Sequence, residues 1–195
     1  PRMKSAAGFE LTSRESFLLF NNALLVVALA LILLGTLYPL FLDALELGKI
    51  SVGPPYFEVV FLVPMLPLLL LVGIGMHAGW KRGQLATAGR RLLWLAAAAL
   101  AAAIVLVAAI WGGFRPLATL GLALGLWVMA SALRVPLDRL RARARLPAAL
   151  VGMSLAHFGL GLTTFGITGV ESFRIERDIA LAPGESAELA GYEFR

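Results

Sequence analysis

The chain has 195 residues, of which 59% are hydrophobic and only 15% are charged. Soluble domains carry a charged side chain at about one position in four, so this composition excludes an ordinary soluble fold. The formal net charge of +5 comes from Lys and Arg in short segments beside long apolar runs, which indicates membrane topology and not a nucleic-acid-binding face. The sequence contains no Cys, which excludes disulfides, thiolate metal sites and thiol redox chemistry within it.

The long apolar runs predict five membrane-spanning helices. Each run has roughly the 20 residues that cross a hydrocarbon core of about 30 Å. Inside lipid every backbone N–H and C=O must be paired within its own segment, so these runs must be helical. The expected spans are about 17–42, 59–76, 92–111, 117–133 and 147–169. The sequence therefore predicts an all-α integral membrane protein, with 1–16 as a cytoplasmic segment and 17–170 as the transmembrane region.

Basic residues are concentrated on one side of the predicted spans. Twelve Lys or Arg side chains lie on the side of residue 1 and five lie on the other. The twelve are Arg2, Lys4, Arg14, Lys81, Arg82, Arg90, Arg91, Arg134, Arg139, Arg141, Arg143 and Arg145. The positive-inside rule then places residue 1 in the cytoplasm and residue 195 outside it.

The connection after the first span, 43–58, has an unusual composition. Pro54 and Pro55 fix the backbone, and Gly53 permits a conformation that other residues avoid. Tyr56 follows at the expected outer interface. Two interpretations stay open: a rigid interfacial turn with an aromatic anchor, or a docking surface for another protein.

The last segment, 171–195, differs in character from the spans. Apolar and polar residues alternate on both sides of a turn expected at 182–185. This pattern predicts the first hairpin of a small extracytoplasmic β module. Because the sequence begins with Pro1 and stops inside this pattern, we expect it to be an internal segment of a longer protein.

His157 is the strongest candidate for chemistry. It lies about ten residues into the last span, so helical rise puts it roughly 15 Å deep, near the bilayer midplane. An ionisable side chain there is costly and is a functional hypothesis by default. Ser154, Gly161 and Thr164 share its helix face and leave room for a flat ligand or another helix. Imidazole is a common axial ligand of haem iron, but a histidine bonded to a neighbouring helix, with glycines for close packing, is an equal alternative.

The second histidine, His77, falls at the end of span two and fits an interfacial loop. It differs in depth from His157 by about 15 Å, so the two imidazoles cannot ligate the same iron. His77 is given no role. Trp127 lies deeper in its span than the other tryptophans and is expected to pack between helices.

Several stretches resemble the CcmF/NrfE family, the large membrane subunit of the bacterial cytochrome c haem lyase. They are Ser13–Glu15, Asn21–Asn22, Gly35–Pro39, Ile50–Phe57, Gly73–Gly75, Trp80–Arg82, Ala156–Gly159, Leu181–Glu185 and Gly191–Tyr192. The resemblance covers nearly the whole chain and corresponds to the carboxy-terminal half of the family. It implies a multi-pass protein of the bacterial inner membrane, with residue 195 in the periplasm.

The resemblance also implies a cofactor. Family members hold a b-type haem between two intramembrane histidines, and His157 matches the second of them. The first belongs to the amino-terminal half of the family, so the second axial ligand is expected outside this segment. Gly161 and Ser154 would then flank the haem. The tryptophan-rich haem delivery motif of the family, with its two flanking histidines, is not in this sequence.

The function implied by the resemblance is cytochrome c maturation. The full protein would accept haem from a haem chaperone and attach it to apocytochrome c, together with other maturation subunits, while embedded in membrane lipid. The alternative from another class is a transporter of haem or a small molecule, with His157 lining the path. A third possibility is a scaffold for neighbouring subunits. No nucleic acid partner is expected.

Overall fold

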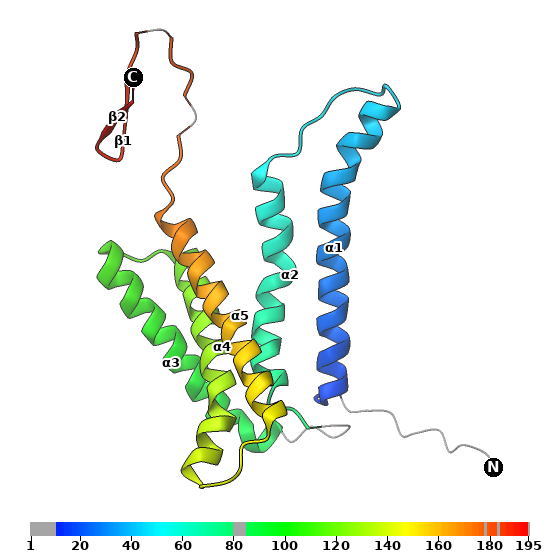
Figure 1. Ribbon diagram of the computed structural model, residues 1–195, viewed down its shortest axis with the longest axis vertical. Coiled ribbons are helices and arrows are strands. Elements are labelled where there is room, and N and C mark those ends of the chain that lie inside the picture. Colours follow the sequence, from blue (N-terminus) through cyan, green and yellow to red (C-terminus); the bar gives the residue numbers. More distant parts are fainter. Residues whose placement is uncertain (1–10, 80–84, 178, 183, 195) are drawn as a thin grey trace, which may run out of the picture.

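The computed structural model describes residues 11–79, 85–177, 179–182 and 184–194 as five long helices followed by a small hairpin (Figure 1). The helices are α1 (Arg14–Ala44), α2 (Pro54–Gly75), α3 (Leu85–Trp111), α4 (Pro116–Arg141) and α5 (Ala148–Phe173). All five are long and apolar enough to cross a membrane, which confirms the predicted fold class. The chain is a multi-pass membrane protein. Most of the predicted cytoplasmic segment, and the Trp80–Arg82 stretch with Lys81, lie outside the described residues.

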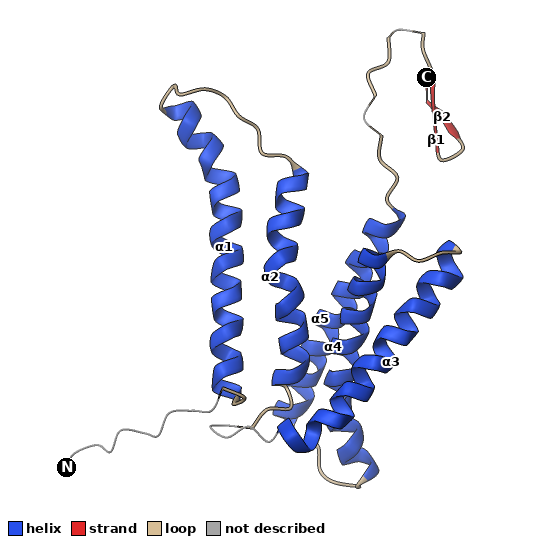
Figure 2. Ribbon diagram, turned by 180° about the vertical axis from the view of Figure 1, so that it is seen from behind, coloured by secondary structure: helices blue, strands red, loops and turns tan. Residues whose placement is uncertain are grey.

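Successive helices run in opposite directions, and their connections alternate between the two ends of the bundle (Figures 1 and 2). α1 and α2 form a hairpin that stands beside the group of α3, α4 and α5. α4 is the central helix, because it packs against α2, α3 and α5. Its most apolar stretch is 56% buried, compared with 6% for α1, so α1 directs most of its apolar side chains outward. Such faces are those that lipid or further helices cover.

The contact between α4 and α5 depends on two glycines. A methyl group added at Gly161 would lie 2.8 Å from Gly125 O and 2.8 Å from Met129 N. A methyl group at Gly125 would lie 3.0 Å from both Gly161 O and Phe165 N. These close neighbours are backbone atoms, which cannot rotate away, so the two helices approach as near as they do only because both positions lack a Cβ.

α2 and α4 meet at a glycine and an indole. The ring of Trp127 lies against Gly73, where an added Cβ would overlap it, and Trp127 Nε1 donates a hydrogen bond to Leu70 O at 3.2 Å. Trp127 is 4% exposed. The prediction that it packs between helices is confirmed, and the buried N–H has the partner that it needs.

Several predicted helix ends were wrong, in each case because the helix is longer than its apolar run. α2 begins at Pro54, so the last part of the predicted 43–58 loop is its first turn. Proline is well suited to that position, since the first helical N–H groups have no intrahelical acceptor. α4 continues to Arg141, through residues that the polar pattern assigned to a loop. Arg134 and Asp138 pair there at 3.9 Å with helical i, i+4 spacing.

The carboxy-terminal hairpin forms at a different place from the one predicted. β1 (Ala187–Leu189) and β2 (Tyr192–Phe194) pair antiparallel around Ala190 and Gly191, whose φ angles are 52° and 83°. Two positive φ values are the signature of the tight turn that suits the twist of a hairpin. The predicted 182–185 turn is present, with Glu185 N bonded to Ala182 O at 3.0 Å, but no strand precedes it in the described residues.

Candidate functional site

A cavity of about 360 Å³ lies between α1, α2 and α5, and His157 is on its wall. We call it the His157 pocket. Its lining residues are Arg14, Phe17, Leu18, Asn21, Leu71, Val72, Gly75, Met76, Met153 and His157. The volume falls within the range of small-molecule sites, which are mostly apolar with a few placed polar groups. The pocket has that composition.

The hydrogen bond of His157 determines which ring nitrogen can bind a metal. His157 Nδ1 lies 2.8 Å from Met153 O, one turn earlier on α5. A carbonyl oxygen can only accept, so Nδ1 carries the proton and Nε2 of the neutral ring keeps its lone pair. This arrangement, in which a backbone carbonyl orients the ring from the far side, is common among metal-binding histidines. The imidazole can therefore act as an Nε2 ligand.

The pocket lies towards one end of α1 and α2. Its α1 residues come from the first two turns of that helix and its α2 residues from the last two turns. The other two walls place the imidazole closer to the end where α1 begins.

The small-residue stripe beside His157 contributes to helix packing and is absent from the pocket wall. Gly161 contacts α4, as described above, and Ser154 is 5% exposed. Thr164 Oγ1 donates to Leu160 O on its own helix at 2.9 Å. The stripe could have left room for a flat ligand or for another helix. At Gly161 it leaves room for another helix, because α4 packs against this position. The room for a ligand lies instead on the side of α5 that faces α1 and α2.

Arg14 and Asn21 are polar pocket residues that the sequence did not single out as site residues. Together with Phe17 and Leu18 they recur at positions 14, 17, 18 and 21, the spacing of a single helix face. That spacing was visible in the sequence. What it could not show is that this face of α1 would meet α5, which is more than 100 residues away along the chain.

The proline-rich motif is placed against α1. Tyr56 packs over Gly35, where an added Cβ would overlap the ring, and Tyr56 Oη donates to Leu31 O at 2.9 Å. Gly53 is the N-cap of α2, and Pro54 and Pro55 occupy its first turn. The aromatic ring thus anchors α2 to α1.

His77 lies just beyond the end of α2 and does not line the His157 pocket. Burial lowers its pKa to about 4, and the positive charge of Arg134 contributes in the same direction. Asp138 and the Ser131 carbonyl oppose the shift, with smaller effects. The ring is therefore neutral at pH 7. The three residues that affect it, Arg134, Asp138 and Ser131, are not among those that line the His157 pocket.

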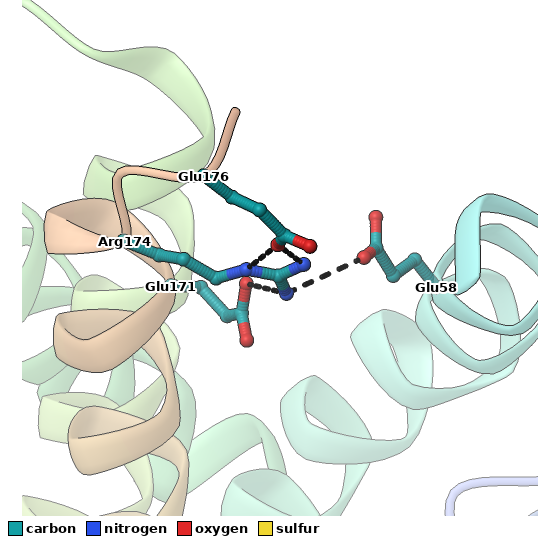
Figure 3. A network of polar contacts seen from close by, with 4 residues as sticks. All are labelled: Glu58, Glu171, Arg174 and Glu176. Atoms are coloured by element: carbon teal, nitrogen blue, oxygen red, sulfur yellow. Dashed lines mark hydrogen bonds and ion pairs between the residues drawn. The ribbon is translucent and has the colours of Figure 1, made fainter. Parts of the chain in front are cut away.

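A network of charged side chains lies at the opposite end of α2 and α5 (Figure 3). Arg174, just after α5, pairs with Glu176, with Glu171 at 3.3 Å and with Glu58 of α2 at 4.0 Å. The hydrogen bond and charge of Glu176, followed by Glu171, raise the pKa of Arg174. Exposed pairs of this kind contribute little individually. Only the Arg174–Glu58 pair joins the start of α2 to the segment after α5, at the end of these helices opposite to the His157 pocket.

Comparison with known proteins gives a consistent result. No family model matches the chain. It is 41% identical over its whole length to the cytochrome c-type biogenesis protein CcmF of Pseudomonas aeruginosa, of which it covers 30%. It is 33% identical over 99% of its length to CcmF of Escherichia coli, and 31% identical over 98% to NrfE of Haemophilus influenzae, again covering 30% of each.

A solved structure entitled "Cytochrome c Heme Lyase CcmF" matches the fold with a TM-score of 0.68 and 27% identity. The match covers 93% of this chain and 29% of the solved one. The chain thus spans about 30% of the length of the relatives that it matches. From the fold, the pocket and these matches together, the chain belongs to the CcmF/NrfE family of cytochrome c-type biogenesis proteins.

Proposed function

We propose that this chain is the part of a cytochrome c maturation protein that holds a b-type haem in the His157 pocket, with His157 Nε2 as one axial ligand. The observation that carries the proposal is the bond from His157 Nδ1 to Met153 O, since it directs the remaining nitrogen lone pair away from its own helix. The ring borders a mostly apolar cavity of about 360 Å³. Both features suit a flat, apolar macrocycle with a central iron.

The residues present fit haem better than they fit a bare metal ion. Within the described part of the chain, no three His, Asp or Glu side chains converge to hold a metal. A single imidazole would suit an iron that receives four further ligands from a porphyrin. When bound, the haem would supply a centre that accepts and releases one electron. Phe17, Leu18 and Leu71 would exclude water from its faces.

The second axial ligand is expected from a part of the protein beyond this sequence, since His77 lies outside the pocket. The names of the relatives, a cytochrome c-type biogenesis protein and a cytochrome c haem lyase, support attachment of haem to apocytochrome c. The proposal adds that the haem comes from a haem chaperone and that other maturation subunits take part. Those names point to cytochrome assembly, so the transporter alternative is not favoured. We infer the bacterial inner membrane as the location, with 1–16 cytoplasmic and 171–195 periplasmic.

The test compares His157→Ala with His77→Ala in a full-length family protein carrying this sequence. We expect His157→Ala to lose most of the bound haem, measured as the pyridine haemochrome of the purified protein, and to lose c-type cytochrome assembly. His77→Ala should keep both. Full haem content and full assembly in His157→Ala would contradict the proposal.

A further inference from the structure

α1 stands at the edge of the bundle, and the described helices leave one of its faces exposed (Figure 1). Its main neighbour is α2, and only 6% of its most apolar stretch is buried. On the exposed face, Leu18, Asn22, Leu25 and Leu29 follow one another at spacings of four, three and four residues. This is the spacing with which one helix packs along another in a coiled coil. We call this face of α1 the Asn22 seam.

Asn22 is the polar member of the seam, and its amide is not fully bonded. Asn22 Oδ1 lies 3.5 Å from Asn21 Nδ2, at the limit of a hydrogen bond, and the Asn22 Nδ2 donors have no acceptor in the described part of the chain. The residue lies five positions after Phe17, where the apolar run begins, which is roughly 7 Å along a helix. An unpaired amide against hydrocarbon costs free energy, so Asn22 indicates a hydrogen-bonding partner on another helix.

The length of the relatives indicates where this partner comes from. The chain matches them over its whole length and covers only about 30% of each, so the larger part of a full-length family protein lies outside this sequence. Helices of that part share a membrane and a polypeptide with α1. Their effective concentration at the seam is therefore much higher than that of a second copy of the protein. Lipid tails, in contrast, offer the amide no hydrogen bond.

We propose that a membrane-spanning helix from the part of the full-length protein outside this sequence packs along the Asn22 seam. This helix is apolar and presents one hydrogen-bond acceptor, a side-chain oxygen or a free backbone carbonyl, at the level of Asn22. The amide fixes the register of the two helices, because any other register leaves it unpaired in lipid. Leu18 also lines the His157 pocket, so the docked helix lies beside that pocket. The proposal does not require haem and stands separately from the proposed function.

The first test is the stability of a full-length family protein carrying this sequence, measured in mixed micelles against denaturing detergent. Asn22→Leu should lower the ratio of folded to unfolded protein roughly threefold to tenfold at a given detergent fraction, the scale of a hydrogen bond between membrane helices. Thr36→Val is the matched control. Thr36 is also exposed on α1, but its hydroxyl already donates to Ile32 O and Leu33 O at 3.1 Å, so the ratio should not change.

A seam that faces lipid predicts the opposite sign, because leucine is more favourable in hydrocarbon than an unpaired amide. If Asn22→Leu is as stable as the wild type, or more stable, the proposal is overturned.

The second test identifies the helix that covers the seam. The photo-crosslinking residue p-benzoylphenylalanine takes the place of Leu29, which is apolar and exposed, and the crosslinked peptides of the full-length protein are identified by mass spectrometry. We expect peptides from outside this sequence, in a product with the mass of one chain. Crosslinks only to lipid, only to peptides within this sequence, or to a second copy in a product of doubled mass would overturn the proposal. Because this variant keeps Asn22, the test holds even if Asn22→Leu does not fold.

Discussion

The close backbone contact between α4 and α5 makes a sharp prediction for Gly161→Ala. The added methyl would lie 2.8 Å from Gly125 O, 2.8 Å from Met129 N and 2.7 Å from Met129 Cγ. Comfortable separations between such atoms are about 3.5–4.0 Å. The side chain of Met129 can rotate, but the two backbone atoms cannot, so α4 and α5 must move apart by roughly 1 Å.

The expected loss of stability is about 1–3 kcal/mol, the usual cost of forcing an extra methylene into a packed interface. A glycine-to-alanine change also alters helix propensity by about 1 kcal/mol in the opposite direction. Gly159→Ala is the matched control, because it lies on the same helix and its added methyl meets nothing within 4 Å in this structure. The difference between the two variants therefore isolates the contact with α4.

The assay is reversible unfolding of the purified protein in mixed micelles, followed by far-UV circular dichroism against denaturing detergent. Gly161→Ala should unfold at a lower detergent fraction than Gly159→Ala. If the two variants unfold together, or if Gly161→Ala is the more stable, then the α4–α5 contact is not as close as described, and the packing role of Gly161 is wrong.

Three further predictions concern other contacts. Gly73→Ala should displace the indole of Trp127, seen as a red shift and weakening of its fluorescence in a variant where the other tryptophans are replaced by Phe. Tyr56→Phe should cost about 0.5–1.5 kcal/mol in the same unfolding assay, because its hydroxyl donates to a carbonyl of α1. His77 has an ordinary pKa of 6.5 when unfolded and about 4 when folded, so the unfolded state takes up its proton first. Stability should fall as pH drops from 6.5 towards 4, and His77→Gln should remove that part of the dependence.

The sequence predicts the number and order of the helices well, because each is an apolar run long enough to cross lipid and each is bounded by polar residues. It predicts their ends poorly. Pro54 and Pro55 suggested a loop, although a helix tolerates proline in its first turn. Arg134 and Asp138 also suggested a loop, because they are charged. A helix can nevertheless continue beyond its apolar stretch with polar residues, and α4 does so through both positions.

The candidate site, like the fold, was predicted only in part. His157 was identified from its position in an apolar run, since an ionisable side chain there is costly. The residues around His157 were not identified, because helix periodicity shows which residues share a helix face but not which other helix that face contacts. The stripe at Gly161 could have admitted a ligand or a helix, and only the position of α4 decides between them. Arg14 and Asn21 could be recognised as pocket residues only once the structure placed residues of α1 and α5 around the same cavity.

The packing of Trp127 has a consequence for how the His157 pocket can adapt to its contents. α2 carries Leu71 and Val72 towards the pocket, while Gly73, in the same turn, rests against the indole. α5 also packs closely on α4. The α2 and α5 walls of the pocket are therefore both supported by the central helix. The third wall, α1, has α2 as its main neighbour and little else behind it. Among the described helices, α1 is therefore the wall of the pocket with the least of this chain packed behind it.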